Sequence, residues 1–206
     1  MKADKELTGA FIGIVDKIDE SIRSGGYGGP QIKMYVAGGL AVNYYTGARF
    51  TNDIDASFSS RIALPPAKEL CATYKGSDGK ESLLYFDNNY NTTFALIHPD
   101  FENDALEWAG CGNERRLVQV CVFSPVDLAV SKLSRFSQND SNDIIALASV
   151  GLISDEAVRN RAMGAMAYYI GNKRDLLLNL DHAGRHISCA TAQRAVRQLN
   201  TPDIGK

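Results

Sequence analysis

In the first sixty residues, segments whose hydrophobic residues follow the helical period of 3.6 are followed by segments with the strand period of two. An amphipathic helix is predicted by apolar residues that share one helical stripe, namely Leu7, Phe11, Ile14, Val15, Ile18 and Ile22. A glycine-rich turn at residues 24–30 ends this helix. After it, the pattern predicts a strand at 32–37, a turn at Gly38-Gly39, a short helix at 40–45 and a strand at 50–58.

The middle of the chain is broken by turn residues. Turn signals at Pro65-Pro66 and at residues 76–79 bracket a predicted short helix. An apolar run that only Gln119 interrupts predicts a central strand at 117–123. Two further strands, joined by a turn, are predicted at 82–86 and 92–97.

From Ser124 onward the pattern is helical. Ser124-Pro125-Val126-Asp127 has a serine cap, a proline at the first helical position and an acid at the third. Helices are predicted at 126–136, 141–150, from Ser154 towards Ile170, 174–180 and 190–199. The sequence therefore predicts an α+β fold: a small mixed β-sheet core with flanking helices in residues 1–124, and a C-terminal helical region in residues 125–206 packed on that core.

The charge balance argues against a general affinity for nucleic acid, because the 206 residues carry a net charge of −2. Residues 150–206 contain eight Lys and Arg against five Asp and Glu, so this third is near +3. Such a helical region could contact RNA or nucleotide phosphates. Ordinary solvated helix faces would give the same excess.

The cysteines and the N-terminal residues indicate in which cellular compartment the protein is expected. Four cysteines without a C-x-x-C pair, and three widely spaced histidines, match no zinc pattern and indicate free thiols. The charged N-terminus does not resemble a signal peptide, and no apolar run is long enough to span a bilayer. We therefore expect a cytoplasmic protein without a membrane partner.

The candidate chemistry lies on the strand predicted at 50–58. Period-two geometry places Asp53, Asp55 and Ser57 on one face, with the two carboxylates roughly 7 Å apart. Neighbouring carboxylates repel each other unless a cation lies between them, so the pair predicts a Mg²⁺ or Mn²⁺ site used in phosphoryl or nucleotidyl transfer. Gly38-Gly39 would let backbone amides approach a triphosphate, since no side chain intervenes.

Positive charge for the phosphates is available on the first C-terminal helix, from Lys132 or Arg135. Each of these features also has an ordinary structural explanation. A glycine pair after a strand is commonly a turn, a D-x-D is common on exposed strands, and a helical lysine is commonly solvated. Their order and spacing together favour the functional interpretation.

In that order and spacing the chain resembles the polymerase-β-like nucleotidyltransferase superfamily, and more closely its bacterial AbiEii-like branch of abortive-infection proteins. The first block that carries the resemblance is Gly38-Gly39 followed by Arg49-x-Thr51-x-Asp53-Ile54-Asp55. The second is Ser124-Pro125-x-Asp127-Leu128, then Lys132-Leu133-x-Arg135, then Asp140-x-x-Asp143-Ile144.

The resemblance implies a role for each matched residue. Asp53 and Asp55 would be catalytic and bind the metal, and Lys132 would contact phosphate. Asp143 would orient the nucleotide, the lysine or the acceptor. The remaining nucleotide-binding residues would be Gly38, Gly39, Arg49 and Thr51. The family turn is often Gly-Ser, and Gly39 here lacks that hydroxyl.

The resemblance also implies a third metal-binding carboxylate with a catalytic role, which normally comes from a neighbouring strand. Asp100 is the candidate, because it would end the strand predicted at 92–97, and Asp87 is the alternative. His98 could act as a general base or as a hydrogen-bonded histidine at a strand end.

The function that these observations predict is metal-dependent transfer of a nucleoside monophosphate from an NTP. The acceptor would be RNA, including a tRNA end, or a protein, and the protein could act as the toxin of a toxin–antitoxin system with an antitoxin partner. The alternative is a catalytically degenerate binding or regulatory module, which Gly39 in the serine position and the undefined third carboxylate favour.

Overall fold

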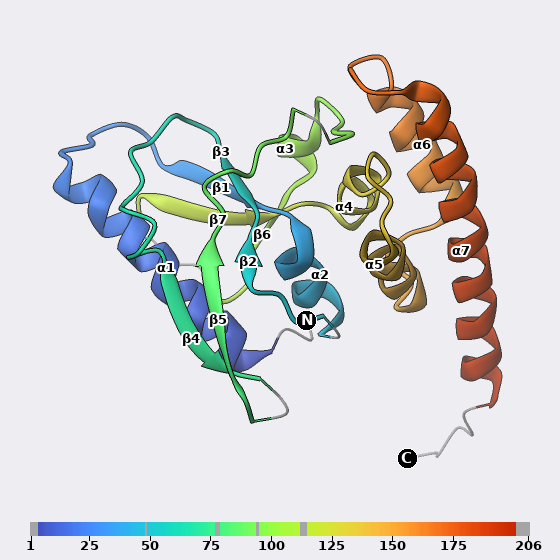
Figure 1. Ribbon diagram of the computed structural model, residues 1–206, viewed down its shortest axis with the longest axis horizontal. Helices are drawn as coiled ribbons and strands as arrows, with labels where there is room; N and C mark the ends of the chain where they lie inside the picture. Colours follow the sequence, from blue (N-terminus) through green and yellow to red (C-terminus); the bar gives the residue numbers. More distant parts are fainter. Residues whose placement is uncertain (1–3, 48, 77–78, 94, 112–114, 201–206) are drawn as a thin grey trace. The chain divides into compact units, whose positions relative to one another are not determined.

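The computed structural model describes residues 4–47, 49–76, 79–93, 95–111 and 115–200. The chain divides into two compact units, shown in Figure 1. Unit 1 comprises Met1–Thr92 and Asp100–Ser124, and unit 2 comprises Thr93–Pro99 and Pro125–Lys206. Small mixed sheets with flanking helices, followed by a helical C-terminal region, confirm the predicted α+β class.

Unit 1 begins with the predicted amphipathic helix. The Asp4 side chain caps it by accepting a hydrogen bond from the Leu7 N–H at 3.0 Å, and its apolar stripe is buried. The elements of unit 1 are α1 (Lys5–Ser24), β1 (Ile32–Val36), α2 (Gly38–Thr46), β2 (Asp53–Ile54), β3 (Ala56–Phe58), β4 (Cys71–Lys75), β5 (Glu81–Phe86), α3 (Phe101–Asp104), β6 (Leu106–Glu107) and β7 (Val118–Val122).

These strands form two sheets. The first has the order β3-β1-β7-β6, in which β1 and β7 are parallel and the outer pairs are antiparallel. The second has the order β2-β5-β4, with β2 parallel and β4 antiparallel to β5. Helix α1 packs against β4 and β5, which buries Tyr74, Leu84 and Phe86 on one face of the second sheet.

The single strand predicted at 50–58 is wrong, because the chain changes sheets at Asp55. The carbonyl of Ile54 accepts a hydrogen bond from the N–H of Asp87, which follows β5, at 3.1 Å. The next carbonyl, that of Asp55, accepts one from Ala37, which follows β1, at 2.8 Å. Successive carbonyls of an extended chain point to opposite flanks. The segment therefore contributes β2 to one sheet and β3 to the other.

Two more predictions in the middle of the chain are wrong. The residues before Gly76 form strand β4 rather than a short helix, because they pair along their whole length with β5. No strand forms among the described residues of 92–97, a range in which Phe94 lies outside the described residues. Leu96 is fully buried and belongs to unit 2, so the apolar pattern there reflects burial rather than strand pairing.

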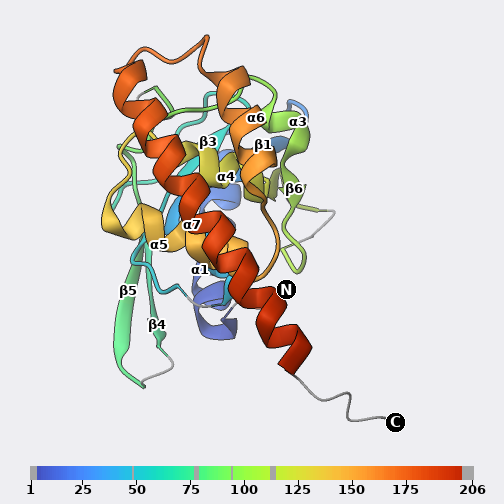
Figure 2. The same cartoon turned by 90° about the vertical axis from the view of Figure 1, so that its right-hand side faces the viewer.

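Unit 2 is helical, with α4 (Pro125–Ser131), α5 (Gln138–Ser149), α6 (Asp155–Ala165) and α7 (Lys173–Asn200). Figure 2 shows α7 running along α5 and α6, both of which it contacts. Its buried residues are Leu176, Leu180, Ala183, Gly184, Ile187 and Ala190. The two helices predicted at 174–180 and 190–199 are therefore one helix, because burial continues through the polar stretch between them.

Helices α4 and α6 are shorter than predicted, whereas α5 begins three residues earlier than predicted and ends at Ser149. Helix α4 ends at Ser131 rather than 136, since a turn follows in which Phe136 has a positive φ of 48°. Helix α5 then begins at a capping box formed by Ser137 and Asp140. Helix α6 has the predicted Ser154 cap and ends at Ala165 rather than near Ile170.

The Asp19 side chain of α1 forms hydrogen bonds with the backbone at the start of β7, and these bonds allow a test of the fold of unit 1. Its carboxylate, 7% exposed as a residue, accepts hydrogen bonds from the N–H groups of Leu117 at 2.6 Å and Val118 at 2.9 Å. Asp19→Ala would leave two inner N–H groups without this acceptor, so we expect a loss of about 2–4 kcal/mol in the free energy of unfolding, measured in urea. Glu20→Ala, on the exposed neighbouring position, is the control, and equal stability of the two variants would contradict this role.

Candidate active site

The glycine pair packs against the aspartate segment at the start of α2. Gly38 has a φ of +61°, and a Cβ at this position would overlap the Asp55 carboxylate. A Cβ on Gly39 would lie 2.8 Å from Thr51 Oγ1 and 3.1 Å from Arg49 Nε. Both glycines are therefore required by side chains of the first block, and the structure brings Gly38, Gly39, Arg49, Thr51 and Asp55 together.

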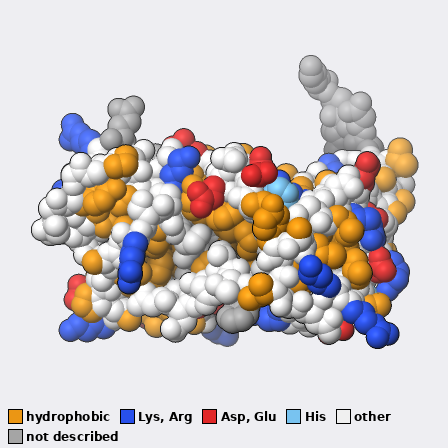
Figure 3. Space-filling model, turned by 90° about the horizontal axis from the view of Figure 1, so that it is seen from above, with side chains coloured by type: hydrophobic (Ala, Val, Ile, Leu, Met, Phe, Trp, Pro, Cys, Tyr) orange, Lys and Arg blue, Asp and Glu red, His pale blue; other side chains and the backbone are white. Residues whose placement is uncertain are grey.

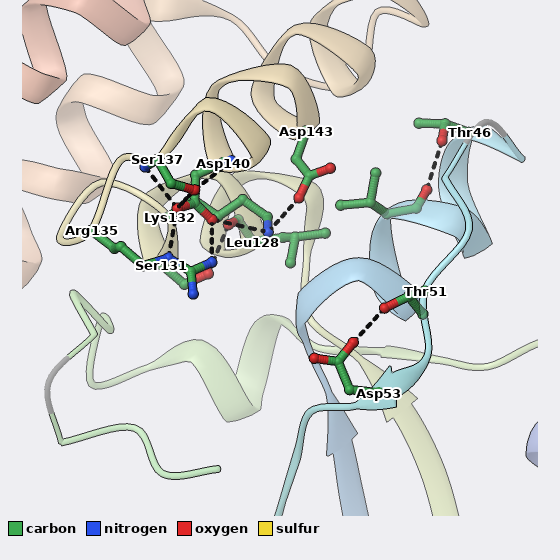
Figure 4. Close-up of polar contacts among 11 residues, drawn as sticks. Thr46, Thr51, Asp53, Leu128, Ser131, Lys132, Arg135, Ser137, Asp140 and Asp143 are labelled. Carbon is green, nitrogen blue, oxygen red and sulfur yellow. Dashed lines mark hydrogen bonds and ion pairs between the residues drawn. The ribbon is translucent and has the colours of Figure 1, made fainter. Parts of the chain in front are cut away.

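Asp53 is held by Thr51, as the right-hand part of Figure 4 shows. The Thr51 hydroxyl donates to Asp53 Oδ1 at 2.5 Å, and the Thr51 carbonyl accepts from the Tyr74 hydroxyl at 3.1 Å. Two residues before Thr51, the Arg49 carbonyl accepts a hydrogen bond from the Asn43 side chain of α2 at 2.6 Å. These bonds fix the orientation of the Asp53 carboxylate relative to the glycine turn.

Asp87 lies beside Asp55, because the pairing of β2 and β5 continues past the ends of both strands. Asp87 follows β5 directly and donates its N–H to Ile54, the last residue of β2. Asp55 and Asp87 therefore leave the sheet at the same edge. The Asp87 carboxylate accepts a hydrogen bond from the Asn89 N–H at 2.9 Å, which keeps it in a turn at this edge.

Tyr90 is a neighbour of Asp55 that the sequence analysis missed. Burial, and then the negative charge of Asp55, raise the pKa of Tyr90 well above that of a free tyrosine. Its hydroxyl therefore stays protonated and can donate a hydrogen bond. The residue follows the turn at Asp87, to whose carbonyl its N–H donates at 3.2 Å.

Asp100 is exposed and precedes the short helix α3. The strand that was expected to bring Asp100 towards Asp53 does not form among the described residues, so no strand pairing supports Asp100 as the third carboxylate.

In the described part of the chain, no group of three or more His, Cys, Asp or Glu could hold a metal. Asp53 and Asp55 still offer the hard oxygen donors that Mg²⁺ prefers, and this ion commonly takes one or two carboxylates with substrate phosphates and water.

In unit 2, Lys132 is buried among carboxylates rather than solvated, as the left-hand part of Figure 4 shows. Its side chain is 7% exposed, and Nζ lies 2.7 Å from Asp143 Oδ2 and 3.7 Å from Asp140 Oδ1. The two carboxylates are three residues apart on α5 and so share one face of that helix. The second block is thus an ion-pair cluster in unit 2.

Asp140 is the centre of this cluster. Arg135 donates two hydrogen bonds of 2.8 Å to its carboxylate, and Ser137 donates through its hydroxyl at 2.7 Å and its N–H at 2.9 Å. Burial by itself would raise the pKa of Asp140. The bonds from Arg135 and Ser137, with the charge of Lys132, outweigh it and lower the pKa to about 2.

Two other residues of interest have structural contacts in unit 2. Asp127 is buried and receives two hydrogen bonds from Arg161 of α6, at 2.7 and 3.0 Å. His98 lies against α6, since a Cβ on Gly164 would be 2.9 Å from its Nε2. His98 is therefore not at a strand end, and its role as a general base stays a prediction.

A comparison with known families decides the class of the protein. The chain matches the family described as "Nucleotidyltransferase of unknown function (DUF6036)" over residues 15–182. It belongs to this family. The match of the nucleotidyltransferase family includes both blocks, from Gly38 to Asp55 and from Ser124 to Ile144. No curated protein and no solved structure matches the chain.

The net charge of −2 predicts no broad basic surface on this member of the nucleotidyltransferase family. On the face drawn in Figure 3, Lys and Arg side chains are scattered among hydrophobic and neutral ones. None of the helices that the structure describes has both the length and the apolar character needed to cross a membrane.

The lowered pKa of Asp140 predicts the acid stability of this cluster. A carboxyl whose pKa falls from 3.8 to about 2 on folding adds about 2 kcal/mol of stability above pH 4, which is lost as the pH falls towards 2. Asp140→Asn should therefore be less stable than the wild type at pH 6, with a gap that narrows in acid, as urea unfolding would measure. Asp181→Asn, an exposed position in unit 2, is the control, and a gap that does not change with pH would contradict the assignment.

Proposed function

We propose that this protein transfers a nucleoside monophosphate from an NTP to an acceptor, with Asp53 and Asp55 as the ligands of Mg²⁺ or Mn²⁺. The observation that supports the proposal is the contact of Gly38 with Asp55, together with that of Gly39 with Thr51, which bonds to Asp53. No Cβ fits at Gly38 beside the Asp55 carboxylate. A phosphate bound to the backbone at this turn would therefore lie next to the carboxylates.

Three features of unit 1 suit a triphosphate. The first N–H groups of α2 have no partner within the helix, and its N-terminus carries a partial positive charge. The Arg49 side chain lies against Gly39 and adds a cation at the same turn. Thr51 fixes Asp53 by its hydrogen bond. A divalent cation held by Asp53 and Asp55 would supply charge compensation for the phosphates.

The reaction needs an acceptor hydroxyl opposite the leaving group. The acceptor oxygen forms a bond to the α-phosphorus, the bond from that phosphorus to the bridging oxygen breaks, and pyrophosphate leaves while the hydroxyl proton passes to water or a base. The glycine turn would hold the departing pyrophosphate, and Asp53 would face the incoming hydroxyl. Tyr90, protonated beside Asp55, would donate a hydrogen bond to a phosphate oxygen.

For the second block we propose the roles that the resemblance implies. Lys132 would contact a phosphate of the nucleotide, and Asp143 would orient the Lys132 side chain. The 2.7 Å ion pair between them supports the orienting role, because Asp143 is the nearer of the two carboxylates beside the ammonium. Asp140 is already bonded to Arg135 and Ser137, so Asp143 is the main partner of Lys132.

The acceptor and the biological role are part of the same proposal. RNA, including a tRNA end, or a protein would receive the nucleotide, and an AbiEii-like toxin with an antitoxin partner would be the physiological setting. The net charge of −2 favours an acceptor bound by local contacts over one held by a broad basic surface.

A second candidate is a binding or regulatory module that has lost catalysis. It is favoured by Gly39, which lacks the serine hydroxyl of related turns, and by the lack of a three-carboxylate cluster in the described residues. A module of this kind would still bind an NTP with Mg²⁺ but would transfer nothing.

The assay for the proposal uses the purified protein, each α-³²P-labelled NTP, Mg²⁺ or Mn²⁺, and total bacterial RNA. We expect label on RNA or on protein, and a loss of about a hundredfold or more in Asp53→Asn and in Asp55→Asn, because each variant removes a charge next to the phosphates. Asp16→Asn, on an exposed carboxylate of α1, should keep its activity.

Thermal unfolding with NTP separates the two candidates. Stabilisation by NTP only with Mg²⁺, without transfer, would support the binding module. Full activity in both folded aspartate variants would contradict the proposal.

For the third catalytic carboxylate we propose the alternative Asp87, because its N–H bonds to the carbonyl of Ile54, the residue before Asp55, whereas Asp100 is exposed before α3. Asp87→Asn should therefore lower the transfer rate by about tenfold or more, and Asp100→Asn should leave it within about twofold. Single-turnover rates with excess enzyme measure the difference. The reverse order would restore Asp100 as the catalytic residue.

A further inference from the structure

One face of the sheet β2-β5-β4 exposes large apolar side chains. Along β5 the residues alternate, with Leu84 and Phe86 buried on the face that α1 covers. On the opposite face, Leu83 is 49% exposed and Tyr85 is 43% exposed. An aromatic ring and an aliphatic side chain therefore lie two residues apart on the face of β5 that α1 does not cover.

The strand register places this ring next to Asp53. Asp53 of β2 and Tyr85 of β5 are paired in the parallel ladder, so their side chains leave the same face of the sheet. Neighbouring strands lie about 4.8 Å apart. A nucleotide whose hydroxyl is held at Asp53 can therefore place its base over the Tyr85 ring.

The backbone hydrogen bonds of Ile54 and Asp55 show on which side of the aspartate segment β5, and with it the Tyr85 ring, lies. At Ile54 the chain bonds to the segment after β5, and at Asp55 it bonds to Ala37, the residue before the glycine turn. The glycine turn and β5 thus flank the aspartate segment on opposite sides. In an in-line displacement, the entering and leaving groups also lie on opposite sides of the phosphorus.

We infer that Tyr85, with Leu83 beside it, is a platform that stacks on the terminal base of a single-stranded nucleic acid acceptor and so positions its hydroxyl. This inference rests on the proposed function for the side from which the acceptor enters. Because every base has a π-face, stacking on a tyrosine accepts different bases without reading their edges. Tyr85 is a positioning residue, since it contacts the acceptor away from the reacting atoms.

The first experiment measures binding without catalysis. A fluorescein-labelled single-stranded RNA of mixed sequence is compared with an oligonucleotide of the same length that lacks bases, in the absence of NTP. The wild type and Tyr85→Phe should prefer the RNA, and Tyr85→Ala should weaken RNA binding by about tenfold and remove that preference. Tyr168→Ala, which removes an exposed tyrosine of unit 2, should bind as the wild type does.

The second experiment measures transfer. Tyr85→Ala should raise the KM for the RNA acceptor by about tenfold and leave the KM for the NTP unchanged. Loss of base-dependent binding in Tyr85→Ala, in a protein that transfers no nucleotide, would support the platform and contradict the proposed function instead.

Three results would overturn the inference. RNA binding that Tyr85→Ala does not change would show that the ring contacts no base. A raised KM for the NTP alone would assign the ring to the incoming nucleotide. Transfer to a protein acceptor with unchanged kinetics in Tyr85→Ala would remove nucleic acid as the ligand. Circular dichroism and melting temperature check that the variant is folded, as expected for an exposed position.

Discussion

Unit 1 depends on one crossover of the backbone, at Ile54 and Asp55. Two successive carbonyls bond to two different partners, Asp87 after β5 and Ala37 after β1. This joins the two sheets through a continuous extended segment and fixes Asp55 from both sides. The glycine turn packs against the Asp55 carboxylate, and the Asp87 turn begins where the Ile54 carbonyl is bonded.

The same crossover explains one error of the sequence analysis, the single strand predicted at 50–58. Side-chain alternation continues through residues 53–58 although the hydrogen-bonding partner changes, so the period cannot reveal the crossover. Helix α1 and the short helix after β1 depend on local signals and were predicted, although α2 begins at Gly38 rather than after the glycine pair. Helix α7 was divided in two, because Ala183, Gly184 and Ile187 form its buried stripe within a polar stretch.

For the candidate site, the sequence predicted the local part and missed the long-range part. Gly38, Thr51, Asp53 and Asp55 lie within eighteen positions of each other, and the structure brings them together. Tyr85 joins them only through the pairing of β2 with β5, which no local pattern specifies. The resemblance implies a phosphate contact for Lys132, and the structure places this side chain, which is 7% exposed, beside two carboxylates of the next helix.

The buried cluster of unit 2 has a consequence for how this chain can vary during evolution. Lys132 faces Asp140 and Asp143, and the exposed Arg135 supplies the second positive charge. Losing Lys132 or Asp143 leaves the other without its 2.7 Å ion-pair partner in a buried position, which is strongly destabilising. Substitutions at these positions are therefore tolerated mainly in compensating pairs. Among relatives, the turn between α4 and α5 and the first turns of α5 should then be inherited as one block, whatever nucleotide or acceptor each relative uses.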